Sequence, residues 1–171
     1  MTESQSPGSD RAAHGEHPAA HGVPAEYVLG IDHVGVAVSD FDAALEWYAR
    51  VLGMVCTHEE VNEAQGVREG MLSPASLLAD DGAPSTGAQL QVLAPLTPES
   101  TIAKFLDRSG PGMQQLAYRV SDLAAVTAHL HEQGVRTLYD APRGGTAGSR
   151  INFVHPKDAG GILVELVEPA S

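Results

Sequence analysis

The sequence of 171 residues has little of several features that would indicate particular kinds of protein. Its single cysteine, Cys56, excludes an intrachain disulfide framework and a zinc site built on cysteines. Basic residues number 10 against 22 acidic ones, and the net charge of −12 makes nucleic acid and anionic membrane surfaces poor partners. No apolar run approaches the length of a membrane span, and no signal-like segment opens the sequence. We therefore expect a soluble, cytoplasmic protein.

What the sequence does contain is a duplication. Residues 31–40 (IDHVGVAVSD) return as residues 113–122 (MQQLAYRVSD). Residues 91–95 (QVLAP), which close the first copy, are matched by residues 165–169 (ELVEP). A repeat of this length indicates one supersecondary unit present twice, whose copies pack together to bury a shared face.

Within each copy the hydrophobic pattern predicts a strand, a helix and three further strands. Alternation of Val34, Val36 and Val38 predicts the first strand, and the apolar spacing that follows predicts a helix over 41–52 that ends at Gly53. The other expected strands cover residues 54–58, 67–72, 88–94, 115–120, 136–139, 150–155 and 161–167. The sequence therefore predicts the α+β class, with two paired βαβββ modules that form a cleft.

The same pattern divides the chain into segments. Residues 1–28, rich in Ser, Gly, Pro, Ala and His, are expected to form a disordered tail. The first module is expected over 29–97 and the second over 113–171. A linker over 98–112, with a short helix, is expected to join them.

Four polar residues, His33, Gln91, Gln115 and Glu165, occupy equivalent points of the two copies. Alternate residues of a strand share a face, so the pairing of two modules would place these side chains around one cavity. One imidazole, two amides and one carboxylate suit Co, Mn, Ni, Mg or Zn better than a metal that prefers thiolates. A single His or Gln in a strand is more often a hydrogen-bonded structural residue than a ligand, so the spacing alone leaves both interpretations open.

The sequence resembles the methylmalonyl-CoA epimerases of the vicinal oxygen chelate superfamily over residues 30–169. The strand motif at 31–37 (IDHVGVA) by itself indicates only the superfamily. The stretches 60–69 (EVNEAQGVRE) and 148–158 (GSRINFVHPKD) are similar to the epimerases in particular. The segments LQVL, at 90–93, and LVEL, at 163–166, complete the resemblance.

This resemblance implies an isomerase that interconverts the 2R and 2S forms of methylmalonyl-CoA. It implies a homodimer and a divalent metal ion, for which we expect cobalt first and otherwise manganese, nickel, zinc or magnesium. The implied metal ligands are His33, Gln91 and Glu165. The family's fourth ligand is a histidine, and Gln115 stands at that position here. An amide oxygen is a weaker donor than imidazole, so we expect late transition metals to bind less tightly. Gln115 would then be a weak ligand or a neighbour bridged by water.

The resemblance also implies two bases on opposite faces of the reacting carbon. Glu69 matches the general acid/base of the family, and Glu165 resembles its partner. Coordination to a metal lowers the basicity of a carboxylate, so Glu165 would either leave the metal when substrate binds or act through a bound water. Glu60 and Glu63 are assigned to the surface or to the surroundings of the base.

Four further residues are candidates for contacts with the substrate. Thr146 matches the small hydroxyl that the family places near the substrate carboxylate, and Ser149 and Arg150 are additional candidates for that role. Lys157 is a candidate for contact with the phosphates of coenzyme A. The glycines around 144–148 do not form a nucleotide-binding loop, because they lack the strand-to-helix context that such a loop needs.

Three other functions differ in how well the sequence supports them. An iron dioxygenase normally needs two histidines and a carboxylate, and His33 is the only histidine at the strand positions. A glyoxalase-like isomerase would be expected to carry a carboxylate where this chain has Gln91. The alternative that Gln115 motivates is a catalytically altered protein that binds an acyl-CoA or a small metabolite without turnover.

Overall fold

The computed structural model describes residues 23–80 and 87–170. The first module contains β1 (Val28–Ala37), α1 (Phe41–Leu52), β2 (Met54–Asn62), β3 (Val67–Pro74) and β4 (Gln89–Pro95). Helix α2 (Thr101–Ser109) follows, and then the second module with β5 (Gly112–Val120), α3 (Leu123–Glu132), β6 (Arg143–Gly144), β7 (Arg150–Val154) and β8 (Val164–Glu168). Three short 3₁₀ turns are η1 (Ala75–Leu77), η2 (Thr146–Gly148) and η3 (Pro156–Asp158).

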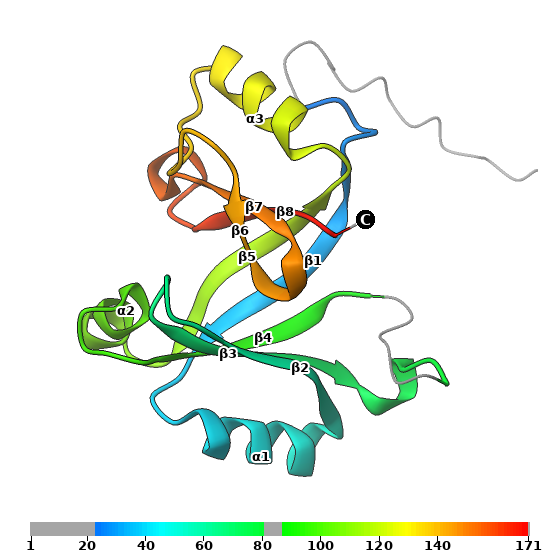
Figure 1. Ribbon diagram of the computed structural model, residues 1–171, viewed down its shortest axis with the longest axis vertical. Coiled ribbons are helices and arrows are strands. Elements are labelled where there is room, and N and C mark those ends of the chain that lie inside the picture. Colours follow the sequence, from blue (N-terminus) through cyan, green and yellow to red (C-terminus); the bar gives the residue numbers. More distant parts are fainter. Residues whose placement is uncertain (1–22, 81–86, 171) are drawn as a thin grey trace, which may run out of the picture.

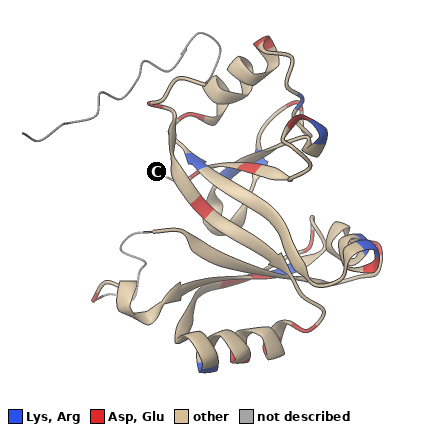
Figure 2. Ribbon diagram, turned by 180° about the vertical axis from the view of Figure 1, so that it is seen from behind, with Lys and Arg blue, Asp and Glu red and all other residues tan. Residues whose placement is uncertain are grey.

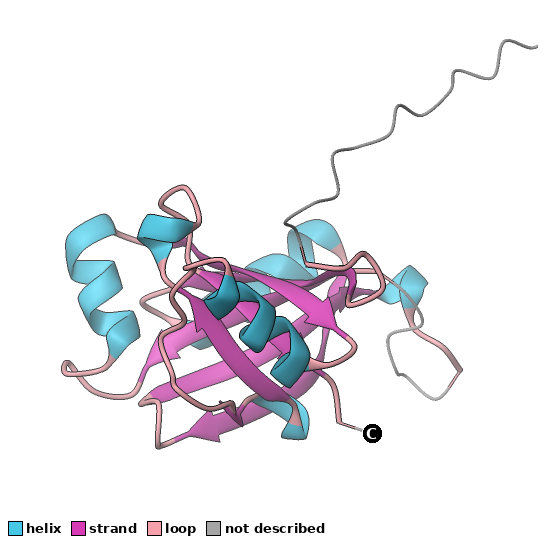
Figure 3. Cartoon of the chain, turned by 90° about the horizontal axis from the view of Figure 1, so that it is seen from above, coloured by secondary structure: helices cyan, strands magenta, loops and turns pink. Residues whose placement is uncertain are grey.

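The strands of both modules form one curled sheet with the order β2-β3-β4-β1-β5-β8-β7-β6 (Figures 1 and 3). Strands β1 and β5 pair antiparallel at its centre, and each is parallel to the last strand of its own module, β4 or β8. Read outward from the centre, the two halves therefore have the same order. The predicted fold class, two paired βαβββ modules, is confirmed.

Helices α1 and α3 both begin with an aspartate N-cap. Asp40 and Asp122 cap α1 and α3, and their carboxylates accept the backbone N–H of Ala43 and Ala125 at 3.0 and 2.9 Å. Such a cap satisfies one of the backbone donors that the first helical turn leaves free. Helix α1 ends as predicted at Gly53, whose φ of 63° is the left-handed conformation that glycine adopts most readily.

Apolar clusters lie on both faces of the sheet. On the outer face, α1 covers Leu72, Val92 and Ala94, and α3 covers Val154 and Leu166. Each Leu or Val buried in this way stabilises the fold by roughly 1.5–3 kcal/mol. On the inner face, α2 contributes Ile102 to a cluster with buried side chains of β1, β3 and β4. The inner face of the second module is lined by Ala117, Ile151, Phe153 and Val167. Helices α1 and α3 pack on the outer clusters, so the inner face between the modules is available for a functional site.

One predicted strand is wrong. Within 136–139 only Thr137 makes a bridge, to Val154, although the backbones of Arg136 and Leu138 also hydrogen-bond to those of His155 at 2.9 Å and Phe153 at 2.8 Å. This backbone pairing stops at Tyr139, where a side chain takes the place of the backbone partner. The amide of buried Asn152 donates to the carbonyl of Tyr139 at 3.0 Å and accepts its N–H at 3.3 Å. Apolar spacing does not encode such a substitution.

The tail expected over 1–28 lies largely outside the described residues. Within the described part, Val23 and Tyr27 pack against the apolar cluster beneath α3, and β1 begins at Val28. No helix of the described chain has the length and apolar character needed to cross a membrane. Acidic and basic residues are dispersed over both modules (Figure 2).

Candidate active site

Gly35 allows two glutamine side chains of the inner face to meet. In the sheet it is the register partner of Gln91 on β4 and of Gln115 on β5. A Cβ atom at Gly35 would lie 2.6 Å from Cγ of Gln115, a distance that side chains do not tolerate. The missing side chain lets the amides of Gln91 and Gln115 contact each other above the strand.

A second set of partners repeats this arrangement on β1, β5 and β8. Ala117 of β5 is the register partner of His33 and of Glu165. It is fully buried and small, so the imidazole and the carboxylate meet above it, with His33 Nε2 and Glu165 Oε2 3.1 Å apart. Gly35 and Ala117 occupy equivalent positions of the duplication. Each module thus provides a small residue over which side chains from both modules meet.

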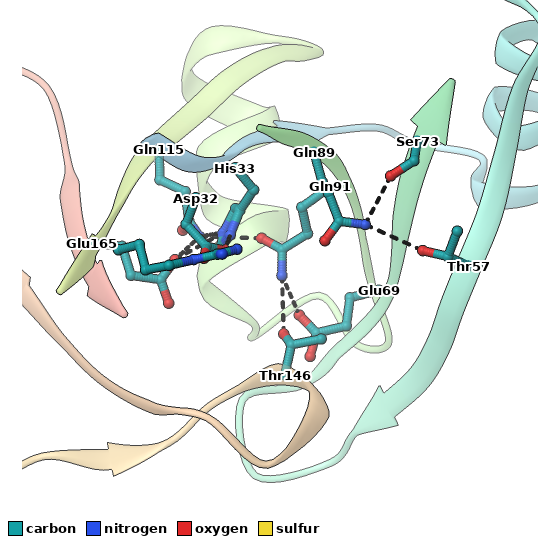
Figure 4. Close-up of polar contacts among 11 residues, drawn as sticks. Asp32, His33, Thr57, Glu69, Ser73, Gln89, Gln91, Gln115, Thr146 and Glu165 are labelled. Carbon is teal, nitrogen blue, oxygen red and sulfur yellow. Dashed lines mark hydrogen bonds and ion pairs between the residues drawn. The ribbon is translucent and has the colours of Figure 1, made fainter. Parts of the chain in front are cut away.

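The polar side chains form a hydrogen-bonded row with a carboxylate at each end (Figure 4). Gln91 Nε2 donates to Glu69 Oε2 at 2.9 Å, and Gln115 Nε2 donates to Gln91 Oε1 at 3.2 Å. Gln115 Nε2 also donates to Glu165 Oε2 at 2.5 Å. All four side chains are buried. The row therefore joins a carboxylate of the first module to one of the second.

His33 is held by two carboxylates. Its Nδ1 lies 2.9 Å from Asp32 Oδ1, and Asp32 Oδ2 in turn accepts from Arg119 Nε at 2.7 Å. Burial alone would lower the pKa of His33, but the hydrogen bonds to Asp32 and Glu165 outweigh it and raise the pKa to about 9. Burial opposes ionisation of Asp32, yet His33 and Arg119 hold its pKa below the ordinary value. Asp32 and Arg119 thereby orient the imidazole.

Glu69 has no cationic partner. Burial raises its pKa to about 7, against the opposing effect of the Thr146 hydroxyl, and the neighbouring Glu60 carboxyl contributes in the same direction as burial. Its Oε1 is buried without a hydrogen-bond partner. Gln91 Nε2 links this carboxyl to Thr146, since it also donates to Thr146 Oγ1 at 3.1 Å. Glu69 is therefore poised to exchange a proton near neutral pH.

Two cavities flank the row. The first cavity, of about 470 Å³, is lined among others by Asp32, His33, His58, Gln89, Arg119 and Glu165. The second cavity, of about 540 Å³, is lined among others by Glu69, Gln91, Gln115, Tyr139, Arg143 and Glu165. Thr146 and Glu165 line both. Volumes of this order hold small-molecule ligands.

The predicted substrate residues divide into two groups. Thr146 and Ser149 line the first cavity. Arg150 instead forms an ion pair with Glu168 at 2.9 Å, and Lys157 is exposed in the turn η3. Neither Arg150 nor Lys157 lines the first or the second cavity. The structure thus brings only the two hydroxyl residues to the site.

Several cavity residues were missed by the sequence analysis. Gln89 donates to Thr57 Oγ1 at 3.2 Å and to Ser73 Oγ at 3.0 Å (Figure 4). It lies two residues before Gln91, so the shared face of a strand was a usable signal. Asp32 adjoins His33 in sequence. Nothing local indicated Arg119, whose place depends on the pairing of β1 with β5.

The donor set fits a divalent cation. Gln115 Nε2 lies 2.5, 3.2 and 3.4 Å from Glu165 Oε2, Gln91 Oε1 and His33 Nε2, so these donor atoms converge on one point. No group of three or more His, Cys, Asp or Glu side chains in the described chain is arranged to hold a metal ion. The two glutamine amides are therefore essential to this set, and amide and carboxylate oxygens with one imidazole suit a hard or borderline cation.

The fold and site define a class of protein. Over residues 32–153 the sequence matches the Glyoxalase/Bleomycin resistance protein/Dioxygenase superfamily, and the chain belongs to it. A structure of methylmalonyl-CoA epimerase from Mycobacterium tuberculosis is 55% identical, with a TM-score of 0.78, and the match covers 88% of this chain and 95% of that one.

Two further relatives agree. A variant of Streptomyces coelicolor methylmalonyl-CoA epimerase in complex with 2-nitronate-propionyl-CoA is 42% identical, with a TM-score of 0.76 and coverage of 84% of this chain and 99% of that one. Ethylmalonyl-CoA/methylmalonyl-CoA epimerase of Cereibacter sphaeroides is 33% identical over 80% of this chain and 95% of its own length. Within the superfamily, this chain belongs to the methylmalonyl-CoA epimerases, a family of isomerases. The resemblance identified from the sequence is confirmed.

The close approach of Gly35 and Gln115 generates a first prediction. Gly35→Ala will displace the Gln115 side chain and lower the free energy of unfolding by about 1–3 kcal/mol, because the new methyl group has no space. Urea denaturation measures the loss. Gln115→Ala removes the clashing Cγ, so the double variant should recover at least about 0.5 kcal/mol relative to the sum of the single changes. Gly144→Ala, with open space at its Cβ position, is the control. Additive effects of Gly35→Ala and Gln115→Ala would contradict the proposed contact.

The buried carboxyl of Glu69 generates a second prediction. Its pKa of about 7 in the folded state lies above the ordinary value of 4.5, so folding disfavours the ionised form. The stability that depends on the protonated form is present below the ordinary pKa and is lost as the pH rises toward 7. In chelator-treated protein, Glu69→Gln should match the wild type near pH 5 and exceed it by about 1–3 kcal/mol near pH 8. Denaturant titrations at both pH values measure this. Glu63→Gln is the exposed control, and a Glu69→Gln variant less stable than the wild type at pH 8 would contradict the prediction.

Proposed function

We propose that this chain interconverts the 2R and 2S forms of methylmalonyl-CoA by moving the proton on C2. The observation that carries the proposal is the pair of buried carboxylates, Glu69 and Glu165, at the two ends of one hydrogen-bonded row. Inversion of a carbon through a planar intermediate needs a base on each face, and the two modules supply one each. The family membership supports the same reaction.

The difficulty of the reaction is electrostatic. C2 of the substrate lies between a thioester and a free carboxylate, so loss of its proton adds negative charge beside an existing one. A bound divalent cation supplies Lewis-acid stabilisation of that charge. His33, Gln91 and Glu165 would hold the cation, since their ligand atoms converge on the Gln115 amide, and Gln115 would bind it through Oε1 in place of the Nε2 that now lies there. We propose cobalt, with manganese, nickel, zinc or magnesium as alternatives.

Glu69 acts as one base in this proposal. Its pKa of about 7 matches proton exchange at neutral pH, where neither the carboxylate nor the carboxylic acid is rare. Gln91 orients it through Oε2, and Thr146 lies next to the same amide, within reach of a substrate carboxylate. These two neighbours hold the base in place without adding a positive charge that would lower its basicity.

Glu165 acts as the second base. It lines both cavities and is held by Gln115 and His33. Its Oε2 is engaged by both partners, so Glu165 acts either after release of that oxygen or through a water. The first and second cavities provide space on either side of the row for the acyl group and for the pantetheine chain. The cytoplasmic location and the homodimer expected from the sequence stay predictions.

Binding of an acyl-CoA without turnover is the second candidate. Gln115 supports it, because an amide replaces the imidazole that the family resemblance implies. Retention of both carboxylates in buried, hydrogen-bonded positions favours turnover, since a binding protein does not need a carboxyl poised near neutral pH.

The direct test of the reaction is proton exchange at C2. In deuterated water the wild type should epimerise methylmalonyl-CoA and incorporate deuterium at C2, as followed by mass spectrometry and chiral analysis. Glu69→Gln should lose at least about a hundredfold in kcat, because the amide cannot accept a proton.

The single variants also separate the two bases. Glu69→Gln and Glu165→Gln should each abolish epimerisation, but each should retain exchange of one epimer, the one that faces the remaining carboxylate. Glu63→Gln serves as the control. Epimerisation that persists at the wild-type rate in Glu69→Gln would rule out the role assigned to this residue, and an acyl-CoA that binds tightly without any exchange would favour the binding protein.

A further prediction concerns the metal. Removal of divalent ions by a chelator should abolish exchange, and their return should restore it. Gln115→His should tighten Co²⁺, Ni²⁺ and Zn²⁺ by about tenfold or more while leaving Mg²⁺ nearly unchanged, because imidazole suits late transition metals. Calorimetric titration of the chelator-treated protein measures this without reference to activity. Equal effects on all four ions would show that residue 115 does not ligate the metal.

A further inference from the structure

The buried position of Glu69 raises a question about the fate of its proton. A base that removes a proton from C2 must lose it again before the next turnover in the same direction. Glu69 is only 3% exposed. Its Oε2 accepts from Gln91, but an amide neither takes up nor passes on a proton at neutral pH. The row through Gln91 and Gln115 therefore cannot carry the proton away from Glu69.

A second carboxyl lies beside Glu69 on the edge strand of the sheet. Glu60 of β2 is the direct register partner of Glu69 in the antiparallel pair β2–β3. Side chains of such partners point to the same face, with Cβ atoms about 5 Å apart. Oε1 of Glu69 is buried and has no hydrogen-bond partner.

Glu60 is connected in turn to an imidazole that reaches the first cavity. Glu60 Oε2 and His58 Nε2 lie 2.6 Å apart, and the side chain of His58 is 39% exposed. His58 also lines the first cavity. Exposure increases from Glu69 through Glu60 to His58, so the three groups lead from the buried base to water. None of the functions assigned above uses Glu60 or His58.

We propose that Glu60 and His58 form a proton relay that returns Glu69 to its carboxylate form between turnovers. This inference rests on the proposed function. A proton on Glu69 moves to Glu60, Glu60 passes one to His58 Nε2, and His58 Nδ1 releases one to water. Only O–H and N–H bonds form and break, and no other reactant is needed. The relay acts on the reaction through Glu69.

The relay predicts a burst in the kinetics of two variants. His58→Gln and Glu60→Gln, studied as full-length protein with one pure epimer, should complete the first turnover per site at nearly the wild-type rate. Later turnovers should be slower by about tenfold or more, because recovery of Glu69 limits them. Added imidazole should accelerate the later turnovers of His58→Gln in proportion to its concentration, whereas a salt of equal ionic strength should not. Rapid-quench sampling with chiral analysis measures both phases.

The neighbouring Glu59 provides a matched control. It binds the half-buried Arg68, at 2.8 Å, and lies on the opposite face of β2. Glu59→Gln should behave as the wild type. Glu60→Gln retains an oxygen that accepts the N–H of Ala147, which Glu60 binds at 3.2 Å, so the loop that carries Thr146 keeps this contact.

Two results would overturn the relay. One is a wild-type steady-state rate in both His58→Gln and Glu60→Gln. The other is an equal slowing of the first and later turnovers without any response to imidazole, which is the behaviour of structural residues. Failure of the proposed function looks different, because the wild type itself would then neither epimerise methylmalonyl-CoA nor exchange its C2 proton, and the relay would fall with it. If the wild type is active, Glu69→Gln is inactive and the relay variants match the wild type, the relay alone is wrong.

Discussion

The site depends on the antiparallel pairing of β1 with β5. This pairing joins the two copies of the duplicated unit into one sheet and sets the register in which Gly35 faces Gln115 and His33 faces Ala117. A shift by one residue would turn every one of these side chains to the other face. Neither module holds a complete site, because the carboxylate Glu165 comes from one and the imidazole His33 from the other. The backbone hydrogen bonds of two central strands therefore determine the geometry of the whole polar cluster.

Burial of so many polar groups is tolerated because they satisfy one another. The amide of Gln91 makes three hydrogen bonds, that of Gln115 donates to Gln91 and to Glu165, and His33 uses both ring nitrogens. An unpaired buried polar atom costs about 1–3 kcal/mol, so such a network is stable only when nearly complete. The exception in this network is Glu69 Oε1, and it belongs to the carboxyl to which we assign the proton transfer. The proposed base is therefore the group that lowers the stability of the network.

The duplication builds the cleft, but the differences between its copies provide the chemistry. Equivalent positions hold His33 and Gln115, or Gln91 and Glu165, so the pseudo-twofold arrangement is chemically unsymmetrical. Glu69 of β3 has Ile151 as its counterpart in the inner lining of the second module. The carboxyl of Glu69 therefore has no counterpart in the second module, where the equivalent position is apolar.

The sequence by itself determined the class of fold and most of the site. Repeated motifs, apolar alternation and a helix-ending glycine are local signals, and they predicted both modules, the end of α1 at Gly53 and the positions of His33, Gln91, Gln115 and Glu165. The strand expected over 136–139 failed because the backbone pairing of this segment with β7 stops at Tyr139, whose N–H and carbonyl pair with the side chain of Asn152.

Only the tertiary structure decided which residues meet. The contact of Glu60 with Glu69 depends on the register of β2 with β3, and the contact of Asp32 with Arg119 on that of β1 with β5. The tertiary structure also pairs Arg150 with Glu168 in an ion pair and leaves Lys157 exposed at the surface. The physical reason is that residue type and periodicity can be read directly from the sequence. The partner of a side chain, in contrast, depends on the hydrogen-bond register between strands that are far apart in sequence.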